Sequence, residues 1–205
     1  MSERSTHWEQ VYTTKGETEV SWFQESPAIS LELIHAANPG LDAAIIDIGG
    51  GASRLADTLL REGFRSIAVL DVSAHALDAA KTRIGPAAAG IDWIIADVTA
   101  WQPSRSYDVW HDRAAFHFLT ETRDRAAYVE RLRSAVRPGG HVIIGTFALD
   151  GPEKCSGLPV QRYDGDSLAA ELGPEFELLD THHDIHHTPW GSKQAFQFSR
   201  FRRRG

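Results

Sequence analysis

The sequence predicts an α/β fold: a seven-stranded, mostly parallel sheet with an antiparallel last strand and helices on both faces. From about residue 40 to residue 172, short apolar runs alternate with segments of helical length and periodicity. Such alternation favours a parallel sheet with right-handed crossovers. After Leu172 two strand-like runs, 176–185 and 194–202, follow each other without a helix between them. This change of order indicates a hairpin that closes the sheet.

Residues 5–40 precede the first apolar run and are expected to contain two helices. One begins near Thr6, and a second is opened by Ser26-Pro27 and continues to Ala37, in keeping with cap and first-turn preferences. The segment between them, 13–19, is predicted to be a polar loop. This part of the chain also carries the widely spaced aromatic residues Trp8, Tyr12 and Trp22.

A glycine-rich turn follows the first predicted strand, in the run IIDIGGGASRL at 45–55. A dinucleotide site requires a third glycine where this chain has Arg54, and a P-loop requires Lys-Ser/Thr where it has residues 52–54. A third interpretation is a nucleoside ligand with a positive charge and no phosphate, which the carboxylate of Asp47 would attract. A plain tight turn is the remaining alternative.

The later strands also end in acidic or polar residues. The second ends at Asp71, about 20 residues after the glycines, where an acid can bind both hydroxyls of a ribose. The third ends at Asp97-Val98 and the fourth at 111–113, on the sheet edge where open parallel sheets bind ligands. Asp97 could instead cap the segment that follows it. The helices expected between and after the strands are 54–62, 74–84, 123–136 and 167–172.

At this point the sequence resembles the class I S-adenosylmethionine-dependent methyltransferases. The match comprises Asp-x-Gly-x-Gly at 47–51, Asp71, Asp97 and Pro-Gly-Gly at 138–140. The resemblance implies a Rossmann-like fold and S-adenosyl-L-methionine as cofactor, with S-adenosyl-L-homocysteine as product. It also implies that Asp47 and the glycines face the methionine portion, that Asp71 holds the ribose and that Asp97 with Val98 contacts the adenine. The cofactor-binding residues expected are Asp47, Gly49, Gly51, Asp71, Val72, Asp97, Val98, His111 and Trp22.

Methyl transfer from a sulfonium requires alignment of an acceptor and exclusion of water, and a base only when the acceptor arrives protonated. The catalytic candidates follow the fourth strand: His117, Asp112 and Arg113. His117 is predicted to act as base or orienting group, with a buried, backbone-bonded histidine as the alternative. Arg113 could bind a carboxylate of the substrate or the cofactor, or pair with Asp112. Residues 112–115 resemble the Asp-Arg-Gly-Ala stretch of thiopurine and thiol methyltransferases, and are similar to the Asp-Lys-Gly-Thr stretch of a group of protein-lysine methyltransferases.

Two segments are expected to form the walls of an acceptor pocket. The N-terminal aromatics look like the tryptophan-bearing cover of the same methyltransferase groups, although they could simply pack on the sheet edge. The second wall is the long loop at 151–165, since long loops without structure of their own tend to be functional. The substrate-binding residues expected are Trp8, Tyr12, Phe116, Cys155 and Tyr163.

Length and composition limit the other possibilities. A chain of 205 residues with 42% apolar residues fits one domain, with an N-terminal cover at 1–40 and a core at 41–205. A single cysteine excludes an internal disulfide and a cysteine-rich zinc site, and the histidines between 182 and 187 are expected to form a polar hairpin face without a metal. The net charge of −7 argues against a nucleic-acid partner. Without an apolar signal core or a run of about 18 apolar residues, we expect a cytoplasmic protein with no membrane partner.

The sequence therefore predicts a methyltransferase that acts on sulfur, nitrogen or oxygen of a small-molecule acceptor. One alternative is a protein-lysine methyltransferase, in which an acidic surface would meet a basic protein substrate. Another is a module that binds the cofactor without catalysis.

Overall fold

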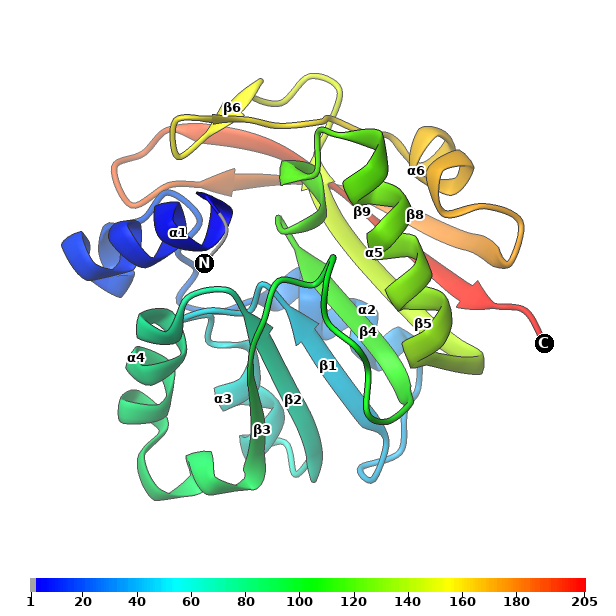
Figure 1. Cartoon of the computed structure of the whole chain (residues 1–205), viewed down its shortest axis with the longest axis horizontal. Helices are drawn as coiled ribbons and strands as arrows, with labels where there is room; N and C mark the ends of the chain where they lie inside the picture. Colours follow the sequence, from blue (N-terminus) through cyan, green and yellow to red (C-terminus); the bar gives the residue numbers. More distant parts are fainter. Residues whose placement is uncertain (1–2) are drawn as a thin grey trace.

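The computed structural model describes residues 3–205, and its centre is a seven-stranded sheet (Figure 1). The strands are β1 Ala44–Ile48, β2 Ser66–Asp71, β3 Ile91–Ile95, β4 Tyr107–Arg113, β5 Val136–Phe147, β8 Phe176–His187 and β9 Lys193–Arg203. Their order is β3-β2-β1-β4-β5-β9-β8. Neighbours from β3 to β5 are parallel, whereas β9 is antiparallel to both β5 and β8. The predicted fold class and the closing hairpin are confirmed.

Helices cover both faces of this sheet. They are α1 Glu3–Thr14, α2 Ala28–Ala36, α3 Leu55–Arg61, α4 Ala74–Ile84, α5 Thr122–Ala135 and α6 Gly165–Leu172, with 3-10 turns η1 Glu17–Glu19, η2 Gly85–Gly90 and η3 Phe116–Phe118. Successive side chains of a strand point to opposite faces, so Ile45 and Ile46 of β1 belong to different cores. Ile45 packs in the core that contains residues of α2 and α3, and Ile46 in the core that contains residues of α5 and α6.

The segment expected to be a loop at 151–165 folds into a short hairpin of its own. Strands β6 Lys154–Cys155 and β7 Leu158–Pro159 pair with each other. Ser156 and Gly157 have φ values of 50° and 79°, and two consecutive positive φ angles are the signature of the tight turn that joins such strands. The segment 151–165 therefore has a defined backbone conformation over the hairpin.

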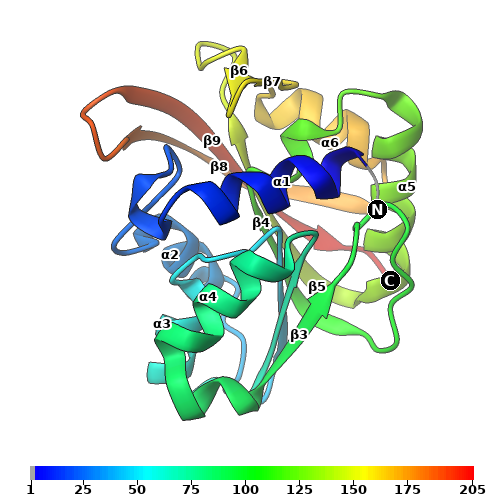
Figure 2. The same cartoon turned by 60° about the vertical axis from the view of Figure 1, so that its left-hand side comes forward.

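Helix α1 lies across the carboxyl ends of the parallel strands (Figure 2). The Ser73 hydroxyl donates to the Glu9 carboxylate at 2.7 Å, and the Ser5 hydroxyl donates to the Val72 carbonyl at 3.2 Å. These bonds tie the helix to the segment after β2, so the predicted N-terminal cover is placed over the sheet edge where ligands bind.

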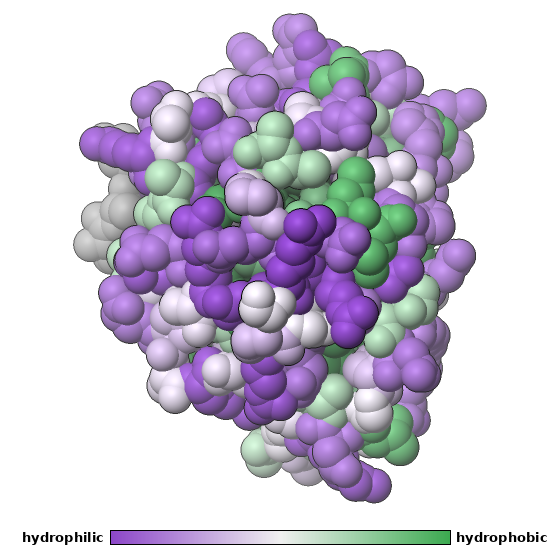
Figure 3. Space-filling model, turned by 90° about the vertical axis from the view of Figure 1, so that its right-hand side faces the viewer, coloured by the Kyte–Doolittle hydropathy of each residue, from purple (hydrophilic) through white to green (hydrophobic). Residues whose placement is uncertain are grey.

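The opposite side of the molecule, over α5, α6 and the C-terminus, is predominantly hydrophilic with small, separate apolar patches (Figure 3). The basic C-terminal run is largely paired there: Arg200 bonds Asp180, and Arg204 lies 4.0 Å from the Glu177 carboxylate. Across residues 3–205, no helix has the length and apolar character needed to cross a membrane.

Candidate functional site

The glycine turn after β1 packs so closely that side chains are excluded from it. Gly49 and Gly51 have φ values of 65° and 45°, in the left-handed region that favours glycine. A Cβ on Gly49 would lie 2.6 Å from the Cβ of Ala115, and one on Gly51 would lie 2.9 Å from the Tyr12 hydroxyl. The bare backbone thereby brings α1 and the segment after β4 against the end of β1.

A buried hydrogen-bonded chain begins at Asp47 of β1. Its carboxylate lies 2.7 Å from Nδ1 of His111 on β4, whose Nε2 lies 2.9 Å from the hydroxyl of Ser30 on α2. All three side chains are buried. A neutral imidazole that donates from Nδ1 to Asp47 and accepts the Ser30 proton satisfies both bonds, and it fixes the orientation of the Asp47 carboxylate.

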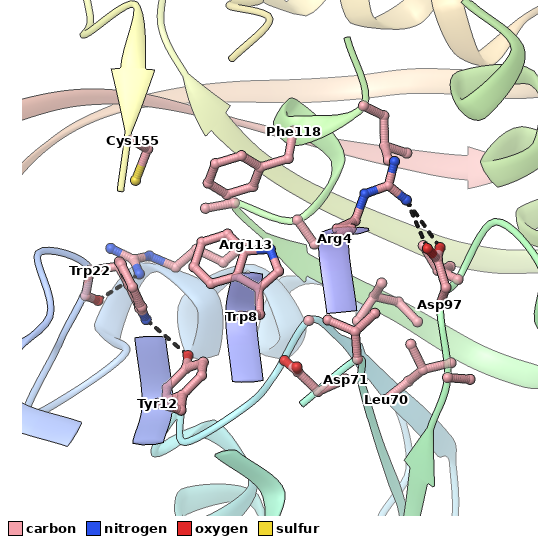
Figure 4. A pocket seen from close by; sticks show the side chains of 18 of the residues that line it. Arg4, Trp8, Tyr12, Trp22, Leu70, Asp71, Asp97, Arg113, Phe118 and Cys155 are labelled. Carbon is pink, nitrogen blue, oxygen red and sulfur yellow. Dashed lines mark hydrogen bonds and ion pairs between the residues drawn. The ribbon is translucent and has the colours of Figure 1, made fainter. Parts of the chain in front are cut away.

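Asp71 stands at the end of β2 and faces the main cavity (Figure 4). Its carboxylate accepts a hydrogen bond from the Ser73 N–H at 2.8 Å. Burial, with a smaller contribution from the charge of Asp47, raises the pKa of Asp71 to about 7 despite the backbone donors that oppose the shift. Asp71 therefore changes charge near neutral pH.

Asp97, after β3, is engaged by two partners. Arg4 of α1 donates to both of its carboxylate oxygens at 3.1 and 3.0 Å and also reaches Asp124 at 2.7 Å. The Thr99 N–H donates to Asp97 at 3.0 Å, as the capping interpretation predicts. The Arg4 contacts hold the N-terminal cover over this end of the cavity (Figure 4).

Aromatic rings form much of the roof and far wall of the main cavity. Trp8 lies edge-on to Phe118 and Trp22, with ring centroids 4.9 and 5.5 Å apart. The Trp22 indole N–H donates to the Tyr12 hydroxyl at 3.2 Å. The lining residues are Arg4, Trp8, Tyr12, Trp22, Ile48, Gly49, Leu70, Asp71, Val72, Ala96, Asp97, Val98, Arg113, Ala114, Ala115, Phe118, Leu119, Phe147, Cys155, Gln194 and Phe196.

A second cavity adjoins the first. Tyr12, Trp22, Gly49 and Arg113 line both cavities, and Asp47, His111 and Ser30 line the second. Every residue of the expected cofactor-binding set thus lines one of the two cavities, apart from Gly51, which lies next to Tyr12 and Asp71.

Arg113 does not form the ion pair with Asp112 that was one of the alternatives for this residue. Its Nη1 donates to the Trp22 carbonyl at 3.0 Å, and its guanidinium lies 4.8 Å from the centre of the Phe196 ring. Asp112 instead accepts hydrogen bonds from the Ala115 N–H at 2.8 Å and the Tyr128 hydroxyl at 2.7 Å, which makes it a structural anchor of the turn after β4.

His117 does not reach either cavity. Its ring is fully buried, and its Nδ1 accepts from the Phe147 N–H at 3.3 Å, as the alternative of a backbone-bonded histidine predicts. Burial, together with the charge of Arg113, lowers the pKa of His117 to about 3, so the imidazole is neutral. The geometry favours a packing role for His117 over that of a base.

Two of the expected substrate-binding residues are also elsewhere. Phe116 and Tyr163 pack against each other in the core, with ring centroids 5.5 Å apart, and line neither cavity. Trp8, Tyr12 and Cys155 do line the main cavity. Burial raises the pKa of Cys155 to about 11, so its thiol is protonated at neutral pH.

Several cavity residues were absent from the sequence prediction. Phe118 occupies the place expected for His117, one residue further along the chain. Gln194 and Phe196 alternate on β9, a spacing that puts both on one face of a strand and that a strand pattern could have indicated. No local pattern marks Arg4.

The fold and the strand-end acids define a class of protein, a Rossmann-like domain with a cavity at the carboxyl edge of its sheet, where such folds bind nucleoside ligands. Residues 45–140 match the family described as "Methyltransferase domain". The matched residues thus correspond to a methyltransferase domain, and the fold is the one found in solved S-adenosylmethionine-dependent methyltransferases.

Curated relatives match part of the chain. A malonyl-[acyl-carrier protein] O-methyltransferase 2 of Ilyobacter polytropus is 27% identical over 107 residues, which is 52% of this chain and 40% of the relative. An EEF1A lysine methyltransferase 2 of Danio rerio is 30% identical over 145 residues, which is 66% of this chain and 61% of the relative. The chain therefore spans between 40% and 61% of the length of these relatives.

Solved structures show the same fold over almost the whole chain. The N-methyltransferase NodS from Bradyrhizobium japonicum, in complex with S-adenosyl-L-homocysteine, has a TM-score of 0.73 and 16% identity, over 98% of this chain and 99% of that one. A structure described with the conversion of a disulfide bond into a thioacetal group during echinomycin biosynthesis has a TM-score of 0.79 and 18% identity, over 98% and 92% of the two chains.

The residues present fit S-adenosylmethionine. Asp71 at the end of β2 would accept the ribose hydroxyls, and the bare glycine turn with the apolar residues Leu70 and Val98 would leave room for the rest of the nucleoside. The carboxylate of Asp47, oriented by His111, suits the ammonium group of the cofactor.

Proposed function

We propose that this chain transfers a methyl group from S-adenosylmethionine to sulfur, nitrogen or oxygen of a small-molecule acceptor held inside the main cavity. The observation that carries the proposal is the partial cover that aromatic side chains form over this cavity. Helix α1 covers it through Trp8 and Tyr12, and Cys155 of the β6–β7 hairpin and Phe196 of β9 form its far wall. This partial cover favours a small acceptor.

In this proposal the cofactor lies along the carboxyl edge of the sheet. Asp97, Val98 and Val72 are placed at its adenine end, Asp71 at the ribose, and Asp47 with Gly49 and Gly51 at the methionine end, with His111 behind Asp47. Trp22 closes the methionine end from above. When bound, the cofactor supplies an electrophilic methyl group on a positively charged sulfur.

The contribution of the chain is positioning and exclusion of water, which together can lower a barrier by roughly 7 kcal/mol in favourable cases. The faces of Trp8, Trp22 and Phe118 suit a cationic sulfonium, and Phe147 and Phe196 offer apolar contacts to the acceptor. Arg113 supplies the one positive charge of the described residues on this wall of the cavity.

The titratable groups favour acceptors that need no base. Among the described residues at the acceptor end, Cys155 is protonated because its pKa is about 11. Tyr12 is also protonated, since burial and the neighbouring Asp71 raise its pKa. We therefore expect sulfur or nitrogen acceptors that present a lone pair in water, such as a thiolate or a neutral amine, ahead of an alcohol.

Methylation of a protein lysine is the second candidate. Two observations favour it: the 30% identity to the Danio rerio lysine methyltransferase, and the net charge of −7, which would attract a basic protein. The covered cavity ranks it below the small-molecule proposal, because a lysine side chain on a folded protein must reach the methyl group through the cover.

The test is incubation with methyl-labelled S-adenosylmethionine and a cell extract, followed by separation of small molecules from macromolecules. Label in small molecules, absent with Asp71→Ala, supports the proposal and provides a compound to identify. Label on protein supports the lysine candidate. Cofactor binding without label in either fraction favours a non-catalytic cofactor-binding module.

A further inference from the structure

We propose that Arg113 forms a carboxylate-binding subsite where the two cavities meet, and that its ligand is the carboxylate at the amino-acid end of the cofactor. The inference rests on the proposed function, because it assigns a residue to the cofactor of that reaction. A carboxylate could also come from an acidic acceptor, and the experiment below separates the two sources.

The guanidinium of Arg113 has unused hydrogen-bonding capacity. Nη1 is bonded to the Trp22 carbonyl, but Nε and Nη2 are buried and have no hydrogen-bond partner among the described residues. Burial lowers the pKa of Arg113 to about 10, which still leaves the group charged at neutral pH. A buried cation without an ion pair is costly, and an anionic ligand would offset that cost.

No charged group nearby among the described residues forms an ion pair with Arg113. Asp184 and Asp47 act on Arg113 at longer range, but neither lies within the 4.0 Å of an ion pair. His186, whose pKa is lowered by burial and by the charge of Arg113, bonds to the Ser21 carbonyl at 2.7 Å. The guanidinium fork therefore keeps two donors for a carboxylate, which it can bind through two parallel hydrogen bonds.

The second cavity offers the matching negative group. Asp47 and Arg113 both line the second cavity. Arg113 and Gly49 also line the main cavity, so the two cavities meet at these residues. Arg54 also lines the second cavity but is paired with Glu25 at 2.6 Å and Glu17 at 3.1 Å. What remains is a carboxylate bonded to a histidine, Asp47, and a guanidinium with two unpaired donors, Arg113. These two groups are the complement of the ammonium and carboxylate groups of an α-amino acid.

The test compares two nucleosides that differ in this end alone. S-adenosylhomocysteine has the amino-acid end, and 5′-methylthioadenosine lacks it. We expect Arg113→Gln to weaken S-adenosylhomocysteine by ~10- to 100-fold in isothermal titration and to leave 5′-methylthioadenosine unchanged. The affinity of Arg113→Lys should lie between those of the unaltered protein and Arg113→Gln, because lysine keeps the charge but loses the planar guanidinium.

Arg65→Gln, in the exposed pair with Asp42, is the matched control, and thermal unfolding shows that each variant is folded.

Equal loss for both nucleosides, or no loss for either, overturns the cofactor assignment. In that event benzoate is titrated into protein saturated with S-adenosylhomocysteine. Benzoate binding that Arg113→Gln abolishes keeps the carboxylate subsite and transfers it to an acidic acceptor, whereas unchanged benzoate binding overturns the subsite. Failure of the unaltered protein to bind either nucleoside would instead refute the proposed function.

Discussion

At the scale of single residues, Asp71 links the chemistry of the site to the stability of the fold. Its native pKa of about 7 lies above its ordinary value of 3.8, so the folded chain keeps a proton that the unfolded chain releases. The stabilising effect of this proton is complete below about pH 4 and is lost as the pH rises to about 7. An ionised Asp71 therefore lowers stability at neutral pH, and it is the form that the proposed ribose contact requires.

Asp71→Asn should remove this dependence. Between pH 5 and pH 8 the free energy of unfolding of the unaltered chain should fall relative to that of the variant, by on the order of 2 kcal/mol. Urea denaturation at the two pH values measures the difference, and Asp42→Asn, at an exposed position, serves as control. Parallel curves for the unaltered chain and Asp71→Asn would mean that Asp71 is ionised throughout.

Cofactor binding should have the opposite dependence on pH. The ionised carboxylate is the better acceptor for ribose hydroxyls, so affinity for S-adenosylhomocysteine should rise as the pH passes about 7. Asp71→Ala should weaken binding by on the order of 1 to 3 kcal/mol and abolish that rise. Fluorescence titration between pH 6 and pH 8.5 tests both statements, and unchanged affinity in Asp71→Ala would remove Asp71 from the ribose site.

His117 shows where residue-level prediction and structure separate. His117→Ala should reduce the free energy of unfolding by on the order of 1 to 3 kcal/mol, because it leaves the Phe147 N–H unpaired and opens a cavity. Turnover per folded molecule should be retained, since the ring reaches neither cavity. Loss of turnover without loss of stability would restore His117 as the base.

At the scale of elements, the parts of the site that were predicted are those with a local signal. The glycine turn and Asp71 follow apolar strands directly, so their place on the sheet edge depends on the chain nearby. The environment of Arg113 depends on Trp22, 91 residues away, and on Phe196 of β9. Ala114 has a φ of 70° in the turn before η3, and Phe118 rather than His117 lines the cavity, which no local pattern of the sequence indicates.

The position of helix α1 over the cavity is the feature that its sequence indicates least. Its apolar and polar residues show little segregation, yet Arg4 fixes it to Asp97 and Asp124 over the cavity. Arg4→Ala should weaken the attachment of this helix and increase the dissociation rate of S-adenosylhomocysteine several-fold. The free energy of unfolding should change little, because the helix can detach locally while the sheet stays folded.

Stopped-flow fluorescence can measure that rate, because Trp8 of this helix and Trp22 both line the cavity. Arg65→Ala, which removes an exposed ion pair, gives the baseline for loss of a surface arginine. An unchanged dissociation rate in Arg4→Ala would show that the helix does not control access.

At the scale of the whole molecule, the net charge and the covered cavity predict different effects of salt on turnover. A chain with a net charge of −7 attracts a basic protein over a distance that shrinks as ionic strength rises, since the Debye length falls from ~10 Å at 0.1 M to ~3 Å at 1 M. A small acceptor bound inside the covered cavity is shielded from this effect. We therefore expect turnover of the identified small acceptor to change less than about twofold between 0.05 and 0.5 M potassium chloride, with cofactor kept saturating throughout. A steep fall over the same range, lost when the acceptor's basic residues are removed, would identify a protein substrate and place recognition on the outer surface.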